Sequence, residues 1–155
     1  MNYSPATRQR IADIHLGIRV DRASSVLPQN TTTTYFEIFG GNVLMTLLVG
    51  ELSVAVGGAC NLTINHDPDD GASAAIGATL DIDTWTPGDI LTISGLLTDN
   101  IIPAVVAGSA SPMSYKGVIL SPGDLEFVTD ASRTGNWIWS LWYVPLEAGA
   151  YVAVA

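Results

Sequence analysis

The stretch from Thr34 to Val56 constrains the fold of this chain most, because it contains two apolar segments separated by Gly40 and Gly41. Two such segments joined by a glycine-rich link predict a β-hairpin. In the second segment the even-numbered side chains from 44 to 56 are almost all apolar, which predicts one strand face in the core throughout. The odd-numbered face is apolar in its first half, so that half needs a cover of its own.

The cover for this odd-numbered face is either a second sheet or a neighbouring subunit. The side chains concerned are Val43, Met45, Leu47 and Val49. Composition favours a subunit contact, because 48% of the residues are hydrophobic and 14% are charged, which suggests more apolar surface than one small domain buries. A subunit interface at these four side chains is therefore the prediction, with a second core layer as the alternative.

Short alternating segments continue to the end of the chain, separated by turn signals at intervals of about 8 to 12 residues. One strand is predicted from 74 to 82, a short edge strand at 101 to 106 within a long loop, and a last strand at 151 to 154. The most aromatic segment, 136 to 146, places Trp137, Trp139, Leu141 and Tyr143 on one face. We predict an all-β fold, an antiparallel β-sandwich resembling a jelly roll, over residues 31–155 as one domain.

Residues 1–30 are predicted to form an extended N-terminal arm, because they contain too few apolar side chains to fold alone. The net charge of the chain is −9. Residues 1–22 hold four arginines against two aspartates, whereas residues 23–155 hold two cations against thirteen acids. A basic arm on an acidic body predicts docking onto an acidic protein surface. The arm residues predicted to make this contact are Arg8, Arg10, Ile14, Leu16, Ile18, Arg19 and Arg22.

A search for catalytic and metal-binding patterns favours a structural role over an enzyme. His15 and His66 stand apart from any cluster at metal-ligand spacing, so no metal and no cofactor is expected. The segment 66–71 resembles a calcium loop but lacks its order of ligands, and Asp81 with Asp83 is better explained as a solvated strand face than as a glycosidase pair. Cys60 lies mid-strand without a neighbouring base and is predicted to be a small core residue.

Charge and hydropathy indicate whether nucleic acid, membrane or carbohydrate is a partner. The acidic body disfavours nucleic acid, because its field repels phosphate. No apolar run approaches the roughly 18 residues of a membrane helix, and with a single cysteine and no apolar leader the chain is expected to be made in the cytoplasm. A carbohydrate-binding surface at Trp85 or an outward Trp139 remains an alternative.

Several short segments together resemble a known protein family. They are Val20-Asp21-Arg22-Ala23, Leu27-Pro28-Gln29 with the threonines that follow, the Gly40-Gly41 link, Leu48-Val49-Gly50-Glu51, and 139–146 with Gly149-Ala150. Over residues 18–155 this pattern resembles small β proteins encoded among the head genes of tailed bacteriophages, the capsid decoration or cement proteins.

The resemblance implies a structural virion protein without enzymatic activity. Such proteins are typically homotrimers on the capsid exterior, with an arm laid over neighbouring subunits of the major capsid protein, where they stabilise the seams of the shell against the pressure of the packaged DNA. The host cytoplasm would be the place of synthesis and the virion the final location. A carbohydrate-binding or fibre-attachment module of the virion, or another head or tail component, is the alternative function.

Overall fold

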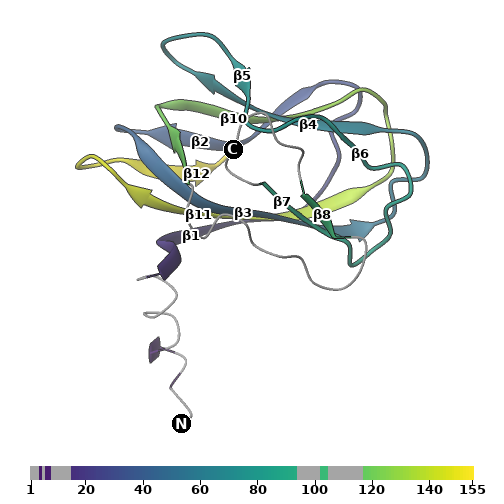
Figure 1. Cartoon of the computed structure of the whole chain (residues 1–155), viewed down its shortest axis with the longest axis horizontal. Coiled ribbons are helices and arrows are strands. Elements are labelled where there is room, and N and C mark those ends of the chain that lie inside the picture. Colours follow the sequence, from purple (N-terminus) through teal and green to yellow (C-terminus); the bar gives the residue numbers. More distant parts are fainter. Residues whose placement is uncertain (1–3, 5, 8–14, 94–101, 105–116) are drawn as a thin grey trace.

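The computed structural model describes residues 4, 6–7, 15–93, 102–104 and 117–155. These residues form two six-stranded antiparallel sheets packed face to face (Figure 1). The predicted all-β antiparallel sandwich is therefore confirmed. The predicted short strand near 101–106 is present as an edge strand, and so is the predicted last strand.

Within the described residues, twelve strands make up the two sheets. Sheet A has the order β1-β11-β3-β7-β8, with β9 also paired to β3, and sheet B has the order β12-β2-β10-β4-β5, with β6 also paired to β4. Their bounds are β1 Ile18–Val26, β2 Thr32–Phe39, β3 Val43–Val54, β4 Asn61–Pro68, β5 Ala74–Ala75, β6 Leu80–Asp81, β7 Ile90–Thr92, β8 Ile102–Ala104, β9 Val118–Leu120, β10 Gly123–Thr129, β11 Asn136–Pro145 and β12 Tyr151–Val154.

The predicted hairpin across Gly40 and Gly41 is wrong, because the two strands that it would join lie in different sheets. Strand β2 pairs with β10 and β12 in sheet B, whereas β3 pairs with β11, β7 and β9 in sheet A. Both glycines have positive φ, +73° and +139°. This left-handed backbone serves equally well to turn a hairpin or to carry the chain from one sheet to the other, so the glycines alone could not distinguish the two.

A β-bulge at Thr46 changes which face of β3 points inward. The register with β11 slips there, since Tyr143 pairs with Met45 and Trp142 with Leu47. Before the bulge the odd-numbered Val43 and Met45 are fully buried, and after it the even-numbered Leu48 and Leu52 are, whereas Val54 at the end of the strand is 44% exposed. The expectation of one continuous even-numbered core face is therefore wrong for the first part of β3, because one extra residue reverses the alternation.

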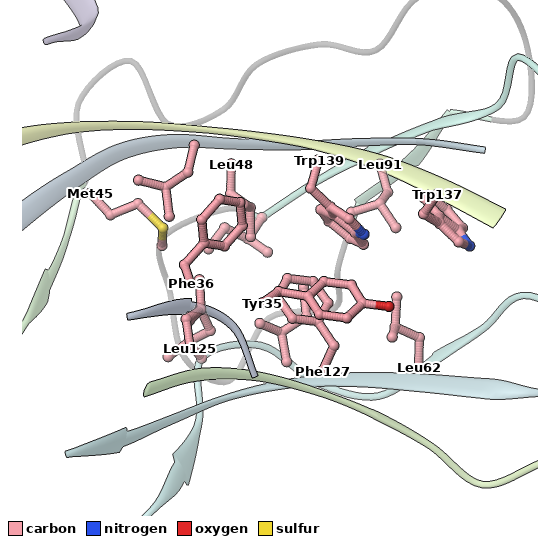
Figure 2. Close-up of a cluster of buried hydrophobic side chains, with 14 of the residues drawn as sticks. Tyr35, Phe36, Met45, Leu48, Leu62, Leu91, Leu125, Phe127, Trp137 and Trp139 are labelled. Atoms are coloured by element: carbon pink, nitrogen blue, oxygen red, sulfur yellow. The ribbon is translucent and has the colours of Figure 1, made fainter. Parts of the chain in front are cut away.

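An aromatic cluster from both sheets fills the interior (Figure 2). Trp137 and Trp139 of β11 stack with ring centroids 5.4 Å apart, and Phe127 of β10 meets Trp139 edge-on at 4.4 Å. Tyr35 of β2 stacks on Phe127 at 4.3 Å, and Trp85 packs against Trp137 at 5.5 Å. The prediction that one face of this most aromatic strand lies in the core is confirmed, because Trp137, Trp139, Leu141 and Tyr143 are all buried.

The segment predicted to be an extended arm contributes a strand to the sandwich. Strand β1 pairs antiparallel with β11 along most of its length, as the edge strand of sheet A. The boundary at residue 30 is therefore wrong, since the sandwich already begins at Ile18. Of the nine side chains of β1, those of Val20, Arg22 and Ser25 are partly covered, and Val20 packs against the core, which supplies an apolar contact that the segment lacks on its own.

Two further predictions along sheet B need correction. The single strand expected from 74 to 82 is two short strands, β5 and β6, which pair with opposite ends of β4. The sequence from His66 to Gly71 also predicts a turn, but this turn starts later, because β4 continues to Pro68. Both errors concern positions where the local pattern fits strand and turn alike.

Gly50 generates a test of the core packing. A Cβ at this position would lie 2.6 Å from Cζ3 of Trp139, whose ring cannot retreat because Trp137 and Phe127 flank it. Alanine usually stabilises a strand relative to glycine, but here we expect Gly50→Ala to lower the free energy of unfolding by about 1–3 kcal/mol through overpacking. Urea denaturation measures the loss.

The matched control is the exposed neighbouring residue, Glu51. Glu51→Ala should change the free energy of unfolding by no more than about 0.5 kcal/mol. A Gly50→Ala variant as stable as the parent protein would show that the Trp139 ring has room to move.

Candidate functional site

The outer face of sheet A carries a row of apolar side chains across three neighbouring strands, which we call the apolar row. Leu44 of β3 lies opposite Ile119 of β9 on one side and Val144 of β11 on the other. Ile119 is 63% exposed and Val144 39%. Adjacent exposed apolar side chains on a sheet are a common feature of surfaces that contact other proteins.

A charged cluster borders the apolar row on the same face. The guanidinium of Arg19 stacks over the ring of Trp142, 4.9 Å from its centroid. Its Nε donates to Oδ1 of Asp21 at 2.6 Å and its Nη2 to Oγ of Ser140 at 3.2 Å. The hydroxyl of Ser140 in turn donates to Asp21 at 2.6 Å. Arg19 is thereby held flat on the sheet beside the apolar row.

The electrostatics of this cluster favour an ionised Asp21. Partial burial raises the pKa of the Asp21 carboxyl, but the hydrogen bonds from Ser140 and Arg19 and the positive charge of Arg19 together outweigh burial. The net effect is a pKa below the ordinary value of 3.8. At neutral pH the cluster therefore contains a paired positive and negative charge, which presents little net charge to a partner.

The outer face of sheet B has the opposite character. Glu37 of β2, Asp124 of β10 and Asp67 of β4 stand directly opposite one another across three strands. Glu126 lies one step further along β10, and burial followed by the charges of Asp67 and Asp124 raises its pKa. Like charges directly opposite each other in a sheet repel, so this face favours water or a cationic partner over another apolar surface.

The predicted subunit interface divides into two parts in the structure. Val43 and Met45 are fully buried within one chain, so their assignment to an interface is wrong and the second-sheet alternative holds for them. Leu47 and Val49 lie opposite Trp142 and Ser140 of β11, but Leu47 is only 9% exposed and belongs to the buried cluster, whereas Val49 is partly exposed. The assignment of Leu47 to an interface is therefore wrong as well, and an interface at Val49 remains a prediction.

The residues predicted to form the capsid-binding arm also lie in different environments in the structure. Arg8, Arg10 and Ile14 lie outside the described residues. Leu16 packs against the core, and its carbonyl oxygen accepts a hydrogen bond from the Thr46 hydroxyl. Ile18 is 48% exposed at the start of β1, and Arg19 belongs to the charged cluster described above.

Arg22 binds within the sandwich, which corrects its assignment to a capsid-binding arm. Its Nη1 donates to the main-chain oxygen of Ala155 at 2.7 Å and to that of Tyr35 at 3.5 Å, and its guanidinium lies 4.3 Å from the centroid of the Tyr35 ring. These contacts join the edge strand of sheet A to the residue that follows β12 in sheet B. Arg22 therefore closes one open edge between the two sheets.

The tryptophans proposed as a sugar platform are not available at the surface. Trp139 is fully buried and Trp85 is 5% exposed, so the prediction of a glycan surface at these two residues is wrong. A different aromatic pair is exposed instead. Phe39 and Tyr151, on neighbouring strands of sheet B, stack with centroids 5.2 Å apart and are 39% and 49% exposed.

The remaining candidates for chemistry are the metal-ligating side chains and Cys60. The described part of the chain holds no group of three or more histidine, cysteine or acidic side chains arranged to bind a metal ion. Cys60 is 2% exposed, as expected of a core residue, and burial raises the pKa of its thiol. Among the described residues no helix has the length and hydropathy to cross a membrane.

The sequence analysis missed the apolar row, because it depends on pairing between distant segments. Ile119 reaches Leu44 through the short ladder between β9 and β3, and the bulge at Thr46 turns Leu44 outward. One signal was available. Three consecutive apolar residues, 118 to 120, occupy a short strand, so at least one of them must face away from the core.

Comparison of the chain with models of protein families, with curated proteins and with solved structures finds no match.

The charged cluster generates a prediction about pH. A carboxyl whose pKa is lowered by folding adds stability above its unfolded value, here about 3.8, and loses that stability as the pH falls through the folded pKa. Asp21→Asn should therefore destabilise the protein at neutral pH by less than about 1 kcal/mol, since the pair is half exposed. The difference from the parent should shrink below about pH 3.8.

Urea denaturation of both proteins between neutral pH and pH 3 checks this expectation, with that lower limit set about one unit below the ordinary pKa of an aspartate. Ser140→Ala serves as a second variant, because it removes one of the two hydrogen bonds that hold the Asp21 pKa down. A difference between parent and Asp21→Asn that does not depend on pH would contradict the assigned role of Asp21.

Proposed function

We propose that the protein is a structural virion component, a decoration protein that binds the outer surface of a bacteriophage head through the outer face of sheet A. The observation that carries this proposal is the apolar row on sheet A, in which Ile119 and Val144 are exposed and Leu44 between them is partly exposed. The resemblance of residues 18–155 to decoration proteins supplies the kind of partner, the major capsid protein.

The path of the chain before β1 supports the same surface. Gly17 lies against Tyr143 and Val144, so closely that a Cβ would be 3.0 Å from Cγ2 of Val144. Leu16 is joined to Thr46 by a hydrogen bond. Leu16 and Gly17 therefore lie beside the apolar row.

The contrast between the two faces supports an orientation on the shell. Sheet A combines the apolar row with the neutralised Arg19 and Asp21 pair, which favours contact with protein. Sheet B carries an acidic row, which favours exposure to water. A protein seated through sheet A would expose sheet B on the outside of the virion.

The mechanism follows from linkage and needs no chemistry at the site. A protein that binds the assembled shell but not the free subunits stabilises assembly by RT ln(1 + [L]/Kd), about 2.7 kcal/mol at a concentration one hundred times Kd. Contacts that span two capsid subunits make binding specific for the assembled state. We propose trimerisation, with Val49 in the contact, as the way in which several copies meet over one seam.

A virion module that binds carbohydrate is the second candidate. The exposed stack of Phe39 and Tyr151 favours it, because aromatic faces pack against the apolar faces of sugar rings. This pair lies on sheet B, so the two candidate functions use different surfaces and can be separated by mutation.

The test is cosedimentation of the purified protein with phage heads that lack it. Val144→Asp combined with Ile119→Asp should reduce occupancy at least tenfold, since desolvating each aspartate in an apolar contact costs at least about 1 kcal/mol. Val154→Asp is the matched control, because Val154 is 42% exposed, close to the 39% of Val144, but lies on sheet B.

Equal loss of occupancy in both proteins would contradict docking through sheet A. Unchanged head binding together with glycan binding that Tyr151→Ala abolishes would favour the second candidate. Circular dichroism of each variant ensures that a loss of binding is not a loss of fold.

A further inference from the structure

The turn between β4 and β5 contains the single Asp-Gly dipeptide of the sequence, Asp70-Gly71. Both residues are exposed, as are the residues on either side of them. Figure 1 shows this turn projecting from the sandwich at the β5 end of sheet B. Neither proposed function uses this segment, and its aspartates form no metal-binding group within the described residues.

The main chain at Gly71 is open to reaction. Its φ is +134°, and the nearest atom to the position of a Cβ is Cγ of Pro68 at 3.3 Å. The described part of the chain contains no hydrogen-bond acceptor for the Gly71 amide, whereas the amide of Asp69, two residues earlier, is held by the carbonyl of Pro122 at 2.9 Å. Glycine leaves its amide nitrogen unshielded, since it has no side chain.

We propose that Asp70 is a site of spontaneous isomerisation to isoaspartate. The amide nitrogen of Gly71 attacks Cγ of Asp70 and loses its proton, while the hydroxyl of the protonated carboxyl leaves as water, which closes a succinimide ring. Water then opens the ring. Attack at Cγ regenerates aspartate, whereas attack at the main-chain carbonyl carbon leaves the chain running through Cβ and Cγ of residue 70, with a free α-carboxylate.

The other described aspartates lack this combination of features. Asp67 precedes Pro68, which has no amide proton to lose. The carboxylate of Asp130 accepts two hydrogen bonds from Asn61, and that of Asp89 accepts two from Thr86. Held carboxylates cannot turn toward the next amide, so Asp70 should isomerise fastest.

The structural consequence stays local. Isomerisation adds one carbon to the main chain of the turn and keeps the net charge, so the nearest pairings affected are that of Pro68 with Gly123 before the turn and that of β5 with β4 after it. Beyond it the amide of Ile76 is bound to the carbonyl of Ile64 at 2.9 Å, in the core. The modified turn would be a substrate for carboxyl methyltransferases that recognise the free α-carboxylate of isoaspartate.

The experiment ages the full-length folded protein at neutral pH and physiological temperature for several weeks. Peptide mapping should show the peptide with Asp70 divided into two peaks of equal mass, the second resistant to a protease that cleaves before aspartate. That peptide should also accept a methyl group from a protein isoaspartyl methyltransferase.

Asp70→Glu should abolish both signals, because a glutamyl carboxyl would have to close a larger and slower ring. Asp83→Glu, at an exposed aspartate that is followed by threonine, should leave them unchanged. Absence of isoaspartate at position 70 in the aged parent, or signals that persist in Asp70→Glu, would overturn the proposal. Near-ultraviolet circular dichroism during ageing confirms that the reaction occurs in the folded chain.

Discussion

The packing of Trp139 between the two sheets is the interaction on which the rest of the structure depends. Its ring lies directly against the main chain of Gly50 in β3 on one side and meets Phe127 of sheet B on the other. A Cβ at position 50 would separate β3 from β11 or push the ring into sheet B. The tryptophan thus determines both how closely β3 lies beside β11 and the distance between the two sheets. That distance is about 10 Å in such folds.

The same packing decides what the protein shows to its surroundings. Because side chains alternate along β11, an inward Trp139 places Trp142 and Val144 on the outer face once the register with β3 is set. The bulge at Thr46 then turns Leu44 outward beside Val144. The apolar row is therefore a consequence of how the core is filled. The surface that a partner would bind thus depends on the packing of the core.

Closure of the sandwich edge connects the fold to the proposed role. Arg22 joins β1 to the residue after β12, so the first strand of the domain is held from both sheets. Arg19, three residues earlier, lies flat on the outer face of sheet A. The two arginines look equivalent in a basic segment, but they have different roles. Arg22 holds the edge of the domain, and Arg19 lies on the surface that we propose to face the capsid.

The sequence by itself determined that the chain is all β and that the aromatic face of β11 is buried, since alternation and turn residues are local signals. Pairing decided the rest. Gly40 and Gly41 permit a hairpin or a change of sheet, and the bulge at Thr46 depends on the register with β11. Contacts between residues far apart in sequence decide that Met45 lies in the core and not at an interface, and that Ile119 meets Leu44. No local pattern encodes such contacts.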